Sequence, residues 1–405
     1  MVDLSRVRVG GPLEPFAAGF AVELLRQGYA LQPAAQQLRL LAHLSRWMAA
    51  ESFGAEGLSE AVVEDFMAAR RAAGYRNLVT ARSLRALLTY LRGAGVTPSA
   101  VAVAVEEPVD VALERYRRYL VVERGVASET VRAYLRSVRP FLMSRLSSDG
   151  QRLDLGGLSA ADVIAFVVAR CPAQSGGAAK QTTTALRSLL RYLHVEGEID
   201  RPLAGAVPSV AGWRLAGLPQ GLEPDQIKRL LDSCDRETAT GRRDFAIVTT
   251  LVRLGLRAGE VAALMLDDVD WRGGAIVVRG KGSRLERLPL PADVGKATAA
   301  YLRDGRPTGA LDRTVFVRVK APHRSMTSSG VTSVVAAAGR RAGLGSIRAH
   351  RLRHTVATQI LRAGGSLPEV GQLLRHRQTV TTAIYAKVDR EALREIARPW
   401  PGVSA

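Results

Sequence analysis

Six polar residues in the C-terminal half of the sequence could together cleave and rejoin a phosphodiester. They are two arginines, one lysine, two histidines and one tyrosine, which in chain order are Arg257, Lys281, His350, Arg353, His376 and Tyr385. A guanidinium group binds phosphate oxygens bidentately and can stabilise the negative charge of a phosphorane-like transition state without a metal ion. A tyrosine hydroxyl can attack phosphorus and form a covalent intermediate, which conserves the energy of the broken ester bond.

The local sequence around these residues decides how specific the pattern is. They stand in four motifs, which in chain order are LGLRAGE (254–260), GKGSR (280–284), HRLRHT (350–355) and LRH followed nine positions on by the tyrosine (374–385). Any one motif alone is as typical of a surface arginine, a hairpin tip or a core tyrosine. Six residues of suitable type in this order are specific.

Together the motifs resemble the catalytic domain of the tyrosine recombinases, also called the phage integrase family. That family has Arg, Lys, His-x-x-Arg, His or Trp, and Tyr in the same order. The similarity covers residues 222–398, and a weaker one extends over the preceding helices, which resemble the family's SAM-like core-binding domains. The resemblance implies a site-specific DNA recombinase of the integrase or transposase type. Such an enzyme works through a 3′-phosphotyrosine intermediate and a Holliday junction, without ATP or metal.

The same resemblance gives roles to the remaining catalytic candidates. Lys281 is the expected general acid that protonates the departing 5′ oxygen. His350 is expected to help deprotonate Tyr385, and His376 to donate a hydrogen bond to the phosphate.

Three neighbouring positions support or depart from the family pattern. Glu260 lies one turn from Arg257 and is expected to orient its guanidinium, whereas His354 has no place in the pattern and is expected to make a local hydrogen bond. Arg375 stands where the family often has glycine, so its side chain would either add a phosphate contact or point to solvent. Gly259 replaces the usual Ser or Thr and weakens the start of its helix slightly.

The composition favours a nucleic acid partner. The 405 residues contain 57 Lys and Arg against 38 Asp and Glu, a formal charge of +19, and a protein this basic usually faces a polyanion. A solvated basic surface is the alternative. Expected phosphate contacts from the helices and the catalytic domain are Arg132, Arg136, Arg139, Lys180, Arg187, Arg284 and Arg375.

Several other classes of function lack their usual signals. Cys171 and Cys234 form no CxxC pair and have no histidine at a metal-ligand spacing, so we expect neither zinc nor disulfides. A Walker loop, a dinucleotide fingerprint and a two-metal acidic cluster are also missing, so no cofactor is expected. Residues 1–29 lack the apolar core that is typical of a signal peptide, and no run of ~18 apolar residues occurs, so neither a leader nor a membrane span is expected. A cytoplasmic, nucleoid-associated enzyme is therefore expected.

An internal repeat organises the first half of the chain. LRALLTYL at 84–91 matches LRSLLRYL at 186–193, and a Leu-Ser step before a helix occurs at both 58–59 and 158–159. Apolar residues at helical spacing predict about four short helices in each copy. We interpret the two stretches as tandem helical core-binding domains, although chance similarity between Leu- and Arg-rich helices would look alike.

The sequence therefore predicts a mainly α protein with a small β-sheet. We expect a first helical domain at 1–105, a second at 106–207, a linker at 208–220 and an α+β catalytic domain with a C-terminal tail helix at 221–405. In the last domain we expect a helix from Asp244 to Leu256 and a hairpin of strands at 275–279 and 285–290 around a Gly-Lys-Gly turn.

The expected partners follow from the family resemblance. They are double-stranded DNA with specific recombination sites and further copies of the chain, which is a monomer or dimer when free and a homotetramer on synapsed DNA. The tail helix at 389–398 would dock on the neighbouring protomer. Accessory directionality proteins or a partner recombinase are further candidates, and no membrane is expected. A topoisomerase IB-like enzyme, a hairpin-forming resolvase and a non-catalytic DNA-binding protein remain alternatives.

Overall fold

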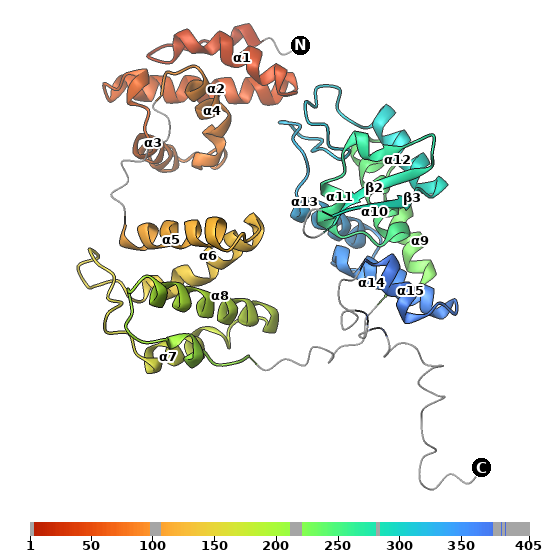
Figure 1. Ribbon diagram of the computed structural model, residues 1–405. Coiled ribbons are helices and arrows are strands. Elements are labelled where there is room, and N and C mark those ends of the chain that lie inside the picture. Colours follow the sequence, from red (N-terminus) through yellow and green to blue (C-terminus); the bar gives the residue numbers. More distant parts are fainter. Residues whose placement is uncertain are drawn as a thin grey trace. The chain divides into compact units, whose positions relative to one another are not determined.

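The structure is a computed structural model that describes residues 4–97, 107–210, 221–280 and 284–375, together with Thr382 and Tyr385. Helices account for most of these residues and accompany one small antiparallel sheet, which confirms the predicted fold class (Figure 1). By compactness the chain divides into residues 100–216 and a second unit of residues 1–99 with 217–405. The buried hydrophobic residues form separate clusters, the larger ones lying within 13–91, 109–207 and 222–352.

The first helical region buries one face of each of its helices. Its α-helices are α1 (Ala17–Arg26), α2 (Leu31–Ala50), α3 (Glu60–Ala72) and α4 (Arg85–Gly93). Apolar residues three or four positions apart, such as Leu38, Leu41 and Met48 of α2, are buried because they share one helix face. Ser59 caps α3, where its side chain accepts a hydrogen bond from the Val62 amide.

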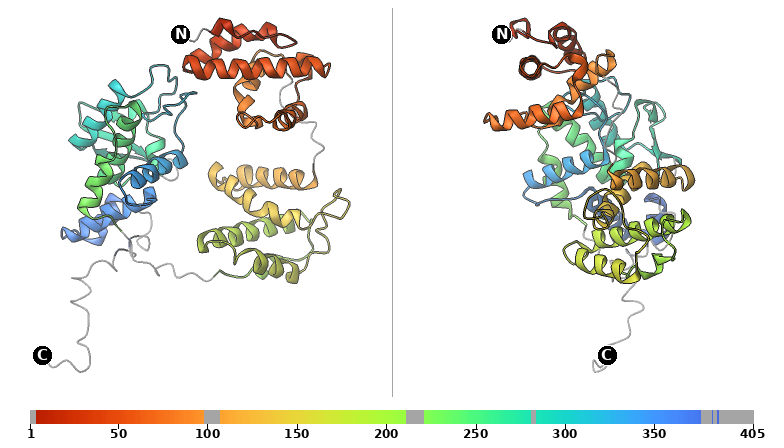
Figure 2. Two further views of the ribbon diagram at one scale, coloured as in Figure 1. Left: turned by 180° about the vertical axis from the view of Figure 1, so that it is seen from behind. Right: turned by 90° about the vertical axis from the view of Figure 1, so that its left-hand side faces the viewer.

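The second helical region has the same kind of construction (Figure 2). Its α-helices are α5 (Pro108–Arg118), α6 (Ser128–Met143), α7 (Ala160–Arg170) and α8 (Gly176–Val195). Ser159 and Asp162 form a reciprocal capping box at the start of α7. Helix α6 ends at Met143, and Ser144 already leads into a turn.

Corresponding positions of the predicted repeat have corresponding environments. Ser59 and Ser159 both cap a helix, and three of the four leucines in each matched eight-residue stretch are buried at corresponding positions. These are Leu84, Leu87 and Leu91 in the first region and Leu186, Leu189 and Leu193 in the second. The duplication itself stays a prediction, which these matched environments support.

The C-terminal region carries the remaining helices and the sheet. Its elements are α9 (Pro224–Asp232), α10 (Ala239–Leu254), α11 (Ala258–Ala262), β1 (Val269–Asp270), β2 (Ala275–Arg279), β3 (Leu285–Pro289), α12 (Ala292–Asp304), α13 (Ser328–Arg341), α14 (Ala349–Arg362) and α15 (Leu367–Leu373). The strands pair antiparallel in the order β1-β2-β3, with Val277 opposite Arg287. This confirms the predicted hairpin, while Lys281 and Gly282 of its Gly-Lys-Gly turn (280–282) and the whole tail helix predicted at 389–398 lie outside the described residues.

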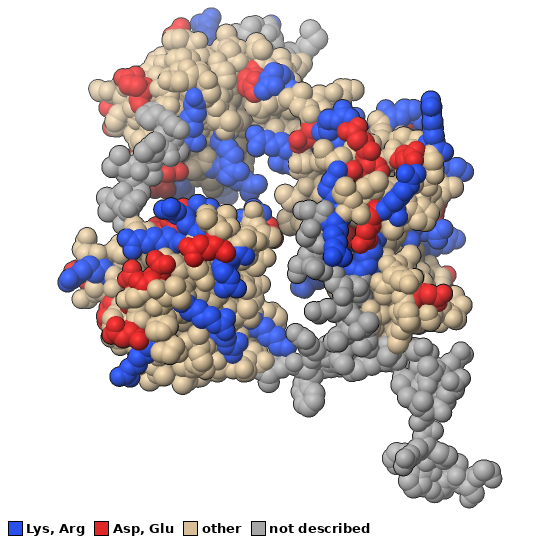
Figure 3. Space-filling view, viewed as in Figure 1, with Lys and Arg blue, Asp and Glu red and all other residues tan. Residues whose placement is uncertain are grey.

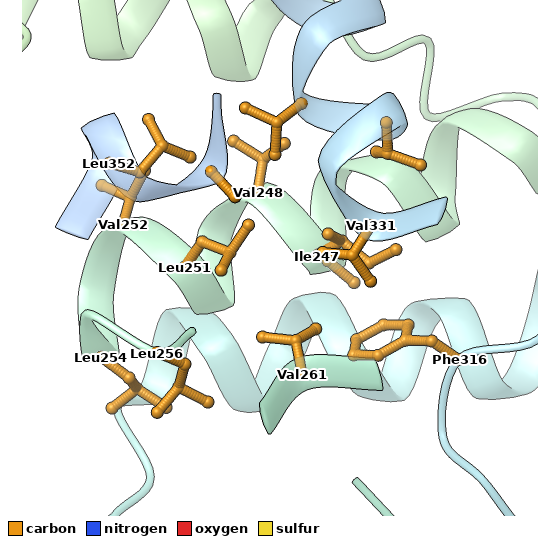
Figure 4. Close-up of a cluster of buried hydrophobic side chains, with 14 of the residues drawn as sticks. Ile247, Val248, Leu251, Val252, Leu254, Leu256, Val261, Phe316, Val331 and Leu352 are labelled. Atoms are coloured by element: carbon orange, nitrogen blue, oxygen red, sulfur yellow. The ribbon is translucent and has the colours of Figure 1, made fainter. Parts of the chain in front are cut away.

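Helix α10 is the centre of this region. Figure 4 shows its apolar side chains packed among residues of the neighbouring elements; those labelled are Ile247, Val248, Leu251, Val252, Leu254, Leu256, Val261, Phe316, Val331 and Leu352. Burying one such side chain contributes about 1.5–3 kcal/mol, so α10 fixes the start of α11 and the face of α14 firmly. The helix begins five residues before the predicted start at Asp244, because Thr238 caps it by accepting a hydrogen bond from the Gly241 amide.

Candidate active site

Arg257 lies at the N-cap of α11, directly after the sharp end of α10. Gly255 ends α10 with a φ of +57°, a left-handed conformation that suits glycine and turns the chain towards α11. The Arg257 side chain is partly exposed, and its Nη1 donates to Oε1 of Glu260 over 2.6 Å. The Arg257 amide donates to Oε2 of the same carboxylate over 2.8 Å. Glu260 therefore fixes both the backbone and the guanidinium of Arg257, as predicted for a supporting residue.

Arg353 lies on α14 and is only 2% exposed. Its Nη1 donates to the Gly255 carbonyl over 2.6 Å, and its Nη2 donates to the Leu374 carbonyl. Burial and, to a smaller extent, the nearby positive charge of Arg257 lower the pKa of Arg353 to about 10. A buried guanidinium with a lowered pKa is stabilised by a nearby anion, and a phosphate group would supply that charge.

Two histidines stack on the same face of α14. His350 and His354 are four residues apart, with ring centroids 4.4 Å from each other in an edge-to-face arrangement. Partial desolvation lowers the pKa of His350, as do the charges of Arg353 and Arg257, although His350 keeps an exposed surface. Burial lowers the pKa of His354 to about 4, and its histidine and arginine neighbours add to the effect. His354 is therefore neutral at pH 7.

Tyr385 is 2% exposed and packs against Ala357, Val370 and Leu374. Its hydroxyl forms a 2.8 Å hydrogen bond with Nδ1 of His354. Burial raises the pKa of the phenol to about 12, while the charge of Arg353 favours the phenolate. The hydroxyl therefore stays protonated at rest, with an imidazole nitrogen beside it.

Arg375 does not point to solvent, which was one of the two orientations expected for it. Its side chain is 6% exposed, and Nη2 donates to Oε2 of Glu260 over 2.8 Å. Its Nε lies 3.4 Å from Oε2 of Glu286 on β3. The alternative that Arg375 points to solvent is thus wrong, because the Glu260 carboxylate draws the guanidinium into the interior. Its assignment as a DNA contact stays a prediction.

The structure brings most of the described catalytic candidates into one neighbourhood. Arg353 is influenced electrostatically by Arg257, Glu260, Arg375 and Tyr385 together. The two remaining candidates, Lys281 and His376, lie outside the described residues. The residues on either side of the loop that carries Lys281 are described. The Gly280 amide donates to the Arg284 carbonyl over 2.8 Å across the base of this loop, and the Arg284 side chain is exposed.

The predicted DNA contacts of the second helical region have varied surroundings. Arg132 and Arg139 are exposed and pair with acidic residues, and acidic side chains lie among the basic ones on the face that Figure 3 shows. Arg136 is exposed and Lys180 half-buried. Arg187 is also half-buried, and its Nη2 donates to the carbonyls of Val207 and Pro208. Arg187 therefore has a clear structural role.

The contact between His354 and Tyr385 was not predicted from the sequence. The available signal was the spacing of His350 and His354, because residues four apart share a helix face and the second histidine must then face the same site. Motif order alone gave His354 no role, and only the fold places Tyr385 against it.

Comparisons with known proteins match both the C-terminal region and the second helical region to one family. The phage integrase family matches residues 220–392, and the phage integrase N-terminal SAM-like domain matches residues 113–197. A protein of Sinorhizobium fredii named putative integrase/recombinase y4rA is 41% identical over 400 residues, 97% of this chain and 95% of that protein. Tyrosine recombinase XerD of Listeria monocytogenes is 30% identical over 294 residues, 71% of this chain and 97% of that protein.

A similarity of fold extends to a solved lambda integrase tetramer bound to a Holliday junction. It has a TM-score of 0.52 at 15% identity and covers 82% of this chain and 90% of that chain. With the matches in sequence, this chain belongs to the tyrosine recombinase, or phage integrase, family and is an enzyme that breaks and rejoins DNA strands. In the part of the chain that the structure describes, no helix is long and apolar enough to cross a membrane.

Proposed function

We propose that this chain is a site-specific recombinase in which Tyr385 is the nucleophile and Arg257 and Arg353 bind the scissile phosphate. The observation that carries the proposal is the surroundings of Tyr385: its hydroxyl contacts a neutral imidazole, and the buried Arg353 nearby favours the phenolate. A buried tyrosine in an ordinary core has no need of either neighbour. Together they supply what a phenolic nucleophile requires, a proton acceptor and a stabilising positive charge.

The two arginines have the donors for a phosphate. A guanidinium carries five N–H groups, and the two hydrogen bonds of Arg353 to main-chain carbonyls leave three for a ligand. Arg257 uses one side-chain N–H on Glu260 and stays partly exposed. Both could therefore bind the non-bridging oxygens as negative charge builds up, and such donors contribute roughly 3–4 kcal/mol each to transition-state stability.

The proton transfers follow from the histidine geometry. With its own proton on Nε2, His354 accepts the Tyr385 proton at Nδ1 while the phenolic oxygen attacks phosphorus. His350, edge-to-face with His354, is placed to share that role rather than to act on the hydroxyl directly. The P–O5′ bond then breaks, and Lys281 protonates the departing oxygen, while His376 donates to the phosphate. Because Tyr385 is 2% exposed, it must become more exposed when DNA binds.

The larger assembly is part of the same proposal. The helical domains at 1–105 and 106–207 and the catalytic domain at 221–405, joined by 208–220, would clamp double-stranded DNA, and separate hydrophobic clusters support this division. The fold shared with a lambda integrase tetramer on a Holliday junction supports a homotetramer on two synapsed sites. Free protein would be a monomer or dimer. Such an enzyme would act in the cytoplasm at the nucleoid, with directionality proteins as partners.

A covalent trapping experiment tests the nucleophile. A nicked suicide duplex, taken from the DNA that flanks the coding region, is incubated with the protein and run on a denaturing gel. We expect a protein–DNA adduct with the wild type and none with Tyr385→Phe. Tyr301→Phe is the matched control, because Tyr301 is an equally buried tyrosine of the same region and should leave the adduct unchanged. An adduct with Tyr385→Phe, or none with the wild type, contradicts the proposal.

A second assay separates recombination from topoisomerase activity. Two duplexes that carry the same site are incubated together, and the products are examined for exchanged flanks. Recombinant product supports the proposal, whereas relaxation of supercoiled DNA without exchange would favour the topoisomerase alternative.

A further inference from the structure

Arg375 has a backbone conformation that arginine rarely adopts. Its φ is +54°, in the left-handed region that glycine enters without a steric cost and other residues enter at some cost. Such a conformation persists only where interactions with the surrounding structure hold the residue in it, and this occurs most often at functional sites. The side chain of Arg375 should therefore supply an interaction that glycine could not.

That interaction is with the carboxylate that holds Arg257. Oε2 of Glu260 accepts both the Arg257 amide and Nη2 of Arg375, each at 2.8 Å, while Oε1 accepts Nη1 of Arg257. Glu260 and Arg375 are 5% and 6% exposed, so this ion pair is shielded from solvent. Arg375 thus shares one oxygen of the carboxylate with the Arg257 amide and holds the carboxylate in place.

The guanidinium makes few other interactions. Within the described chain, its Nε and Nη1 are buried without a hydrogen-bond partner, and Nε lies 3.4 Å from the Glu286 carboxylate. Glu286 stands on β3, the strand that follows Lys281, and Arg375 directly precedes His376. Arg375 therefore contacts or adjoins the segments that carry the proposed catalytic residues Arg257, Lys281 and His376.

The charges explain why a third arginine is useful there. An Arg257–Glu260 pair alone is neutral and attracts a phosphate weakly. The side chains of Arg257, Arg353 and Arg375 with Glu260 and Glu286 carry one net positive charge, and without Arg375 they carry none. Arg375 thus compensates the carboxylate that orients Arg257, and it leaves the charge of Arg257 available for an anion.

We propose that Arg375 is a positioning residue of the active site, which holds Glu260 against Arg257, keeps the phosphate site positively charged and ties β3 to the segment before His376. This inference rests on the proposed function, because it assumes that Arg257 binds the scissile phosphate. It differs from a direct DNA contact, since the Arg375 side chain is buried and paired with Glu260 rather than exposed to a ligand.

The test compares variants at this position on the suicide duplex. Arg375→Gly removes the guanidinium and suits the left-handed backbone, and Ser52→Gly is the matched control because Ser52 is an exposed residue with a φ of +61°. We expect the single-turnover rate of adduct formation at saturating protein to fall by about 10- to 100-fold in Arg375→Gly. Ser52→Gly should match the wild type, and Arg375→Lys should recover part of the rate.

Affinity for the duplex separates positioning from direct contact. A positioning role leaves the slope of log affinity against log salt unchanged, whereas loss of a phosphate contact reduces it by about 0.9. A cleavage rate within twofold of wild type in folded Arg375→Gly overturns the inference, and so does a reduced salt slope. If Arg375→Gly does not fold, Arg375→Asn is judged by the same two criteria, because asparagine also tolerates this conformation.

A double variant tests the charge argument. In Arg375→Gly/Glu260→Gln the lost positive charge is matched by a lost negative one, so the cleavage rate should exceed that of Arg375→Gly alone. A purely structural clamp predicts a rate at least as low as in the single variant, and that result contradicts charge compensation. The wild type is tested beside every variant. If the wild type forms no adduct, the proposed function is contradicted. If it forms one and the Arg375 variants cleave like the wild type, only the inference about Arg375 is contradicted.

Discussion

Charged side chains are placed differently in the second helical region and in the C-terminal, catalytic region. In α6 of the helical region, Arg132 pairs with Glu129 and Arg139 with Asp110, and all four side chains are largely exposed. In the catalytic region, Arg375 pairs with Glu260 and both are almost wholly buried, while Arg353 is buried against two main-chain carbonyls. The helical region buries apolar side chains instead, among them those of α8.

This difference indicates what each region is built for. Exposed ion pairs contribute about 0–1 kcal/mol, so the helical region depends for stability on its apolar core. Burying charges costs free energy even when they are paired, and apolar replacements are often as stable. The proposed function gives a reason for that cost, because arginines that bind a phosphate must be held in a fixed geometry.

The largest expected effect is that of Arg353→Met. Methionine fills similar space but donates no hydrogen bond, so the phosphate loses a donor and the carbonyls of Gly255 and Leu374 lose theirs. We expect adduct formation on the suicide duplex to fall by at least about 10²–10³-fold. Arg117→Met, at an exposed arginine of the helical region that pairs with Glu114, is the control and should change the rate little. Equal losses in both variants would remove the contrast between the regions.

The next effect belongs to the apolar core of the helical region. Leu189 on α8 is fully buried, so Leu189→Ala should reduce the free energy of unfolding by about 2–5 kcal/mol in urea titration. Val168→Ala, at an exposed position of α7, should change it by less than about 0.5 kcal/mol. A small effect of Leu189→Ala would mean that this core is not what stabilises the region.

The comparison also explains what the sequence could reveal. Helical periodicity predicted the helices of both N-terminal regions, because burial there is repeated every three or four residues along one element. The six catalytic candidates and the supporting role of Glu260 were predicted because their types and order are distinctive. The start of α10 was predicted too late, since its cap at Thr238 lies before the apolar run.

Long-range pairings were beyond the sequence. Nothing local connects Arg375 with Glu260, or Tyr385 with His354, because each contact joins elements that only the tertiary fold brings together. The left-handed backbone at Arg375 is likewise set by the turn after α15. A single sequence therefore supplies candidates for the chemistry more readily than it supplies the contacts that hold them in place.

The smallest expected effect is a dependence of stability on pH that arises in the catalytic region. His354 has a pKa of about 4 in the folded protein and an ordinary value near 6.5 when unfolded. Between these values the unfolded chain binds more protons, so the free energy of unfolding falls as the pH drops from about 6.5 towards 4. Without screening by solvent, a pKa shift of this size would lower the free energy of unfolding by roughly 3 kcal/mol, at ~1.36 kcal/mol per pKa unit. The ring is half-buried, so about 1 kcal/mol is expected.

Urea titrations at pH 7 and pH 4.5 measure this loss. His354→Asn should show a smaller loss between the two pH values than the wild type, because the depressed imidazole is gone. Some dependence should remain, since the pKa of His350 is lowered in the same direction. His194→Asn replaces a histidine of the second helical region and controls for the removal of an imidazole elsewhere. If both variants lose as much stability as the wild type, the buried imidazole beside Tyr385 is not the source of the acid sensitivity.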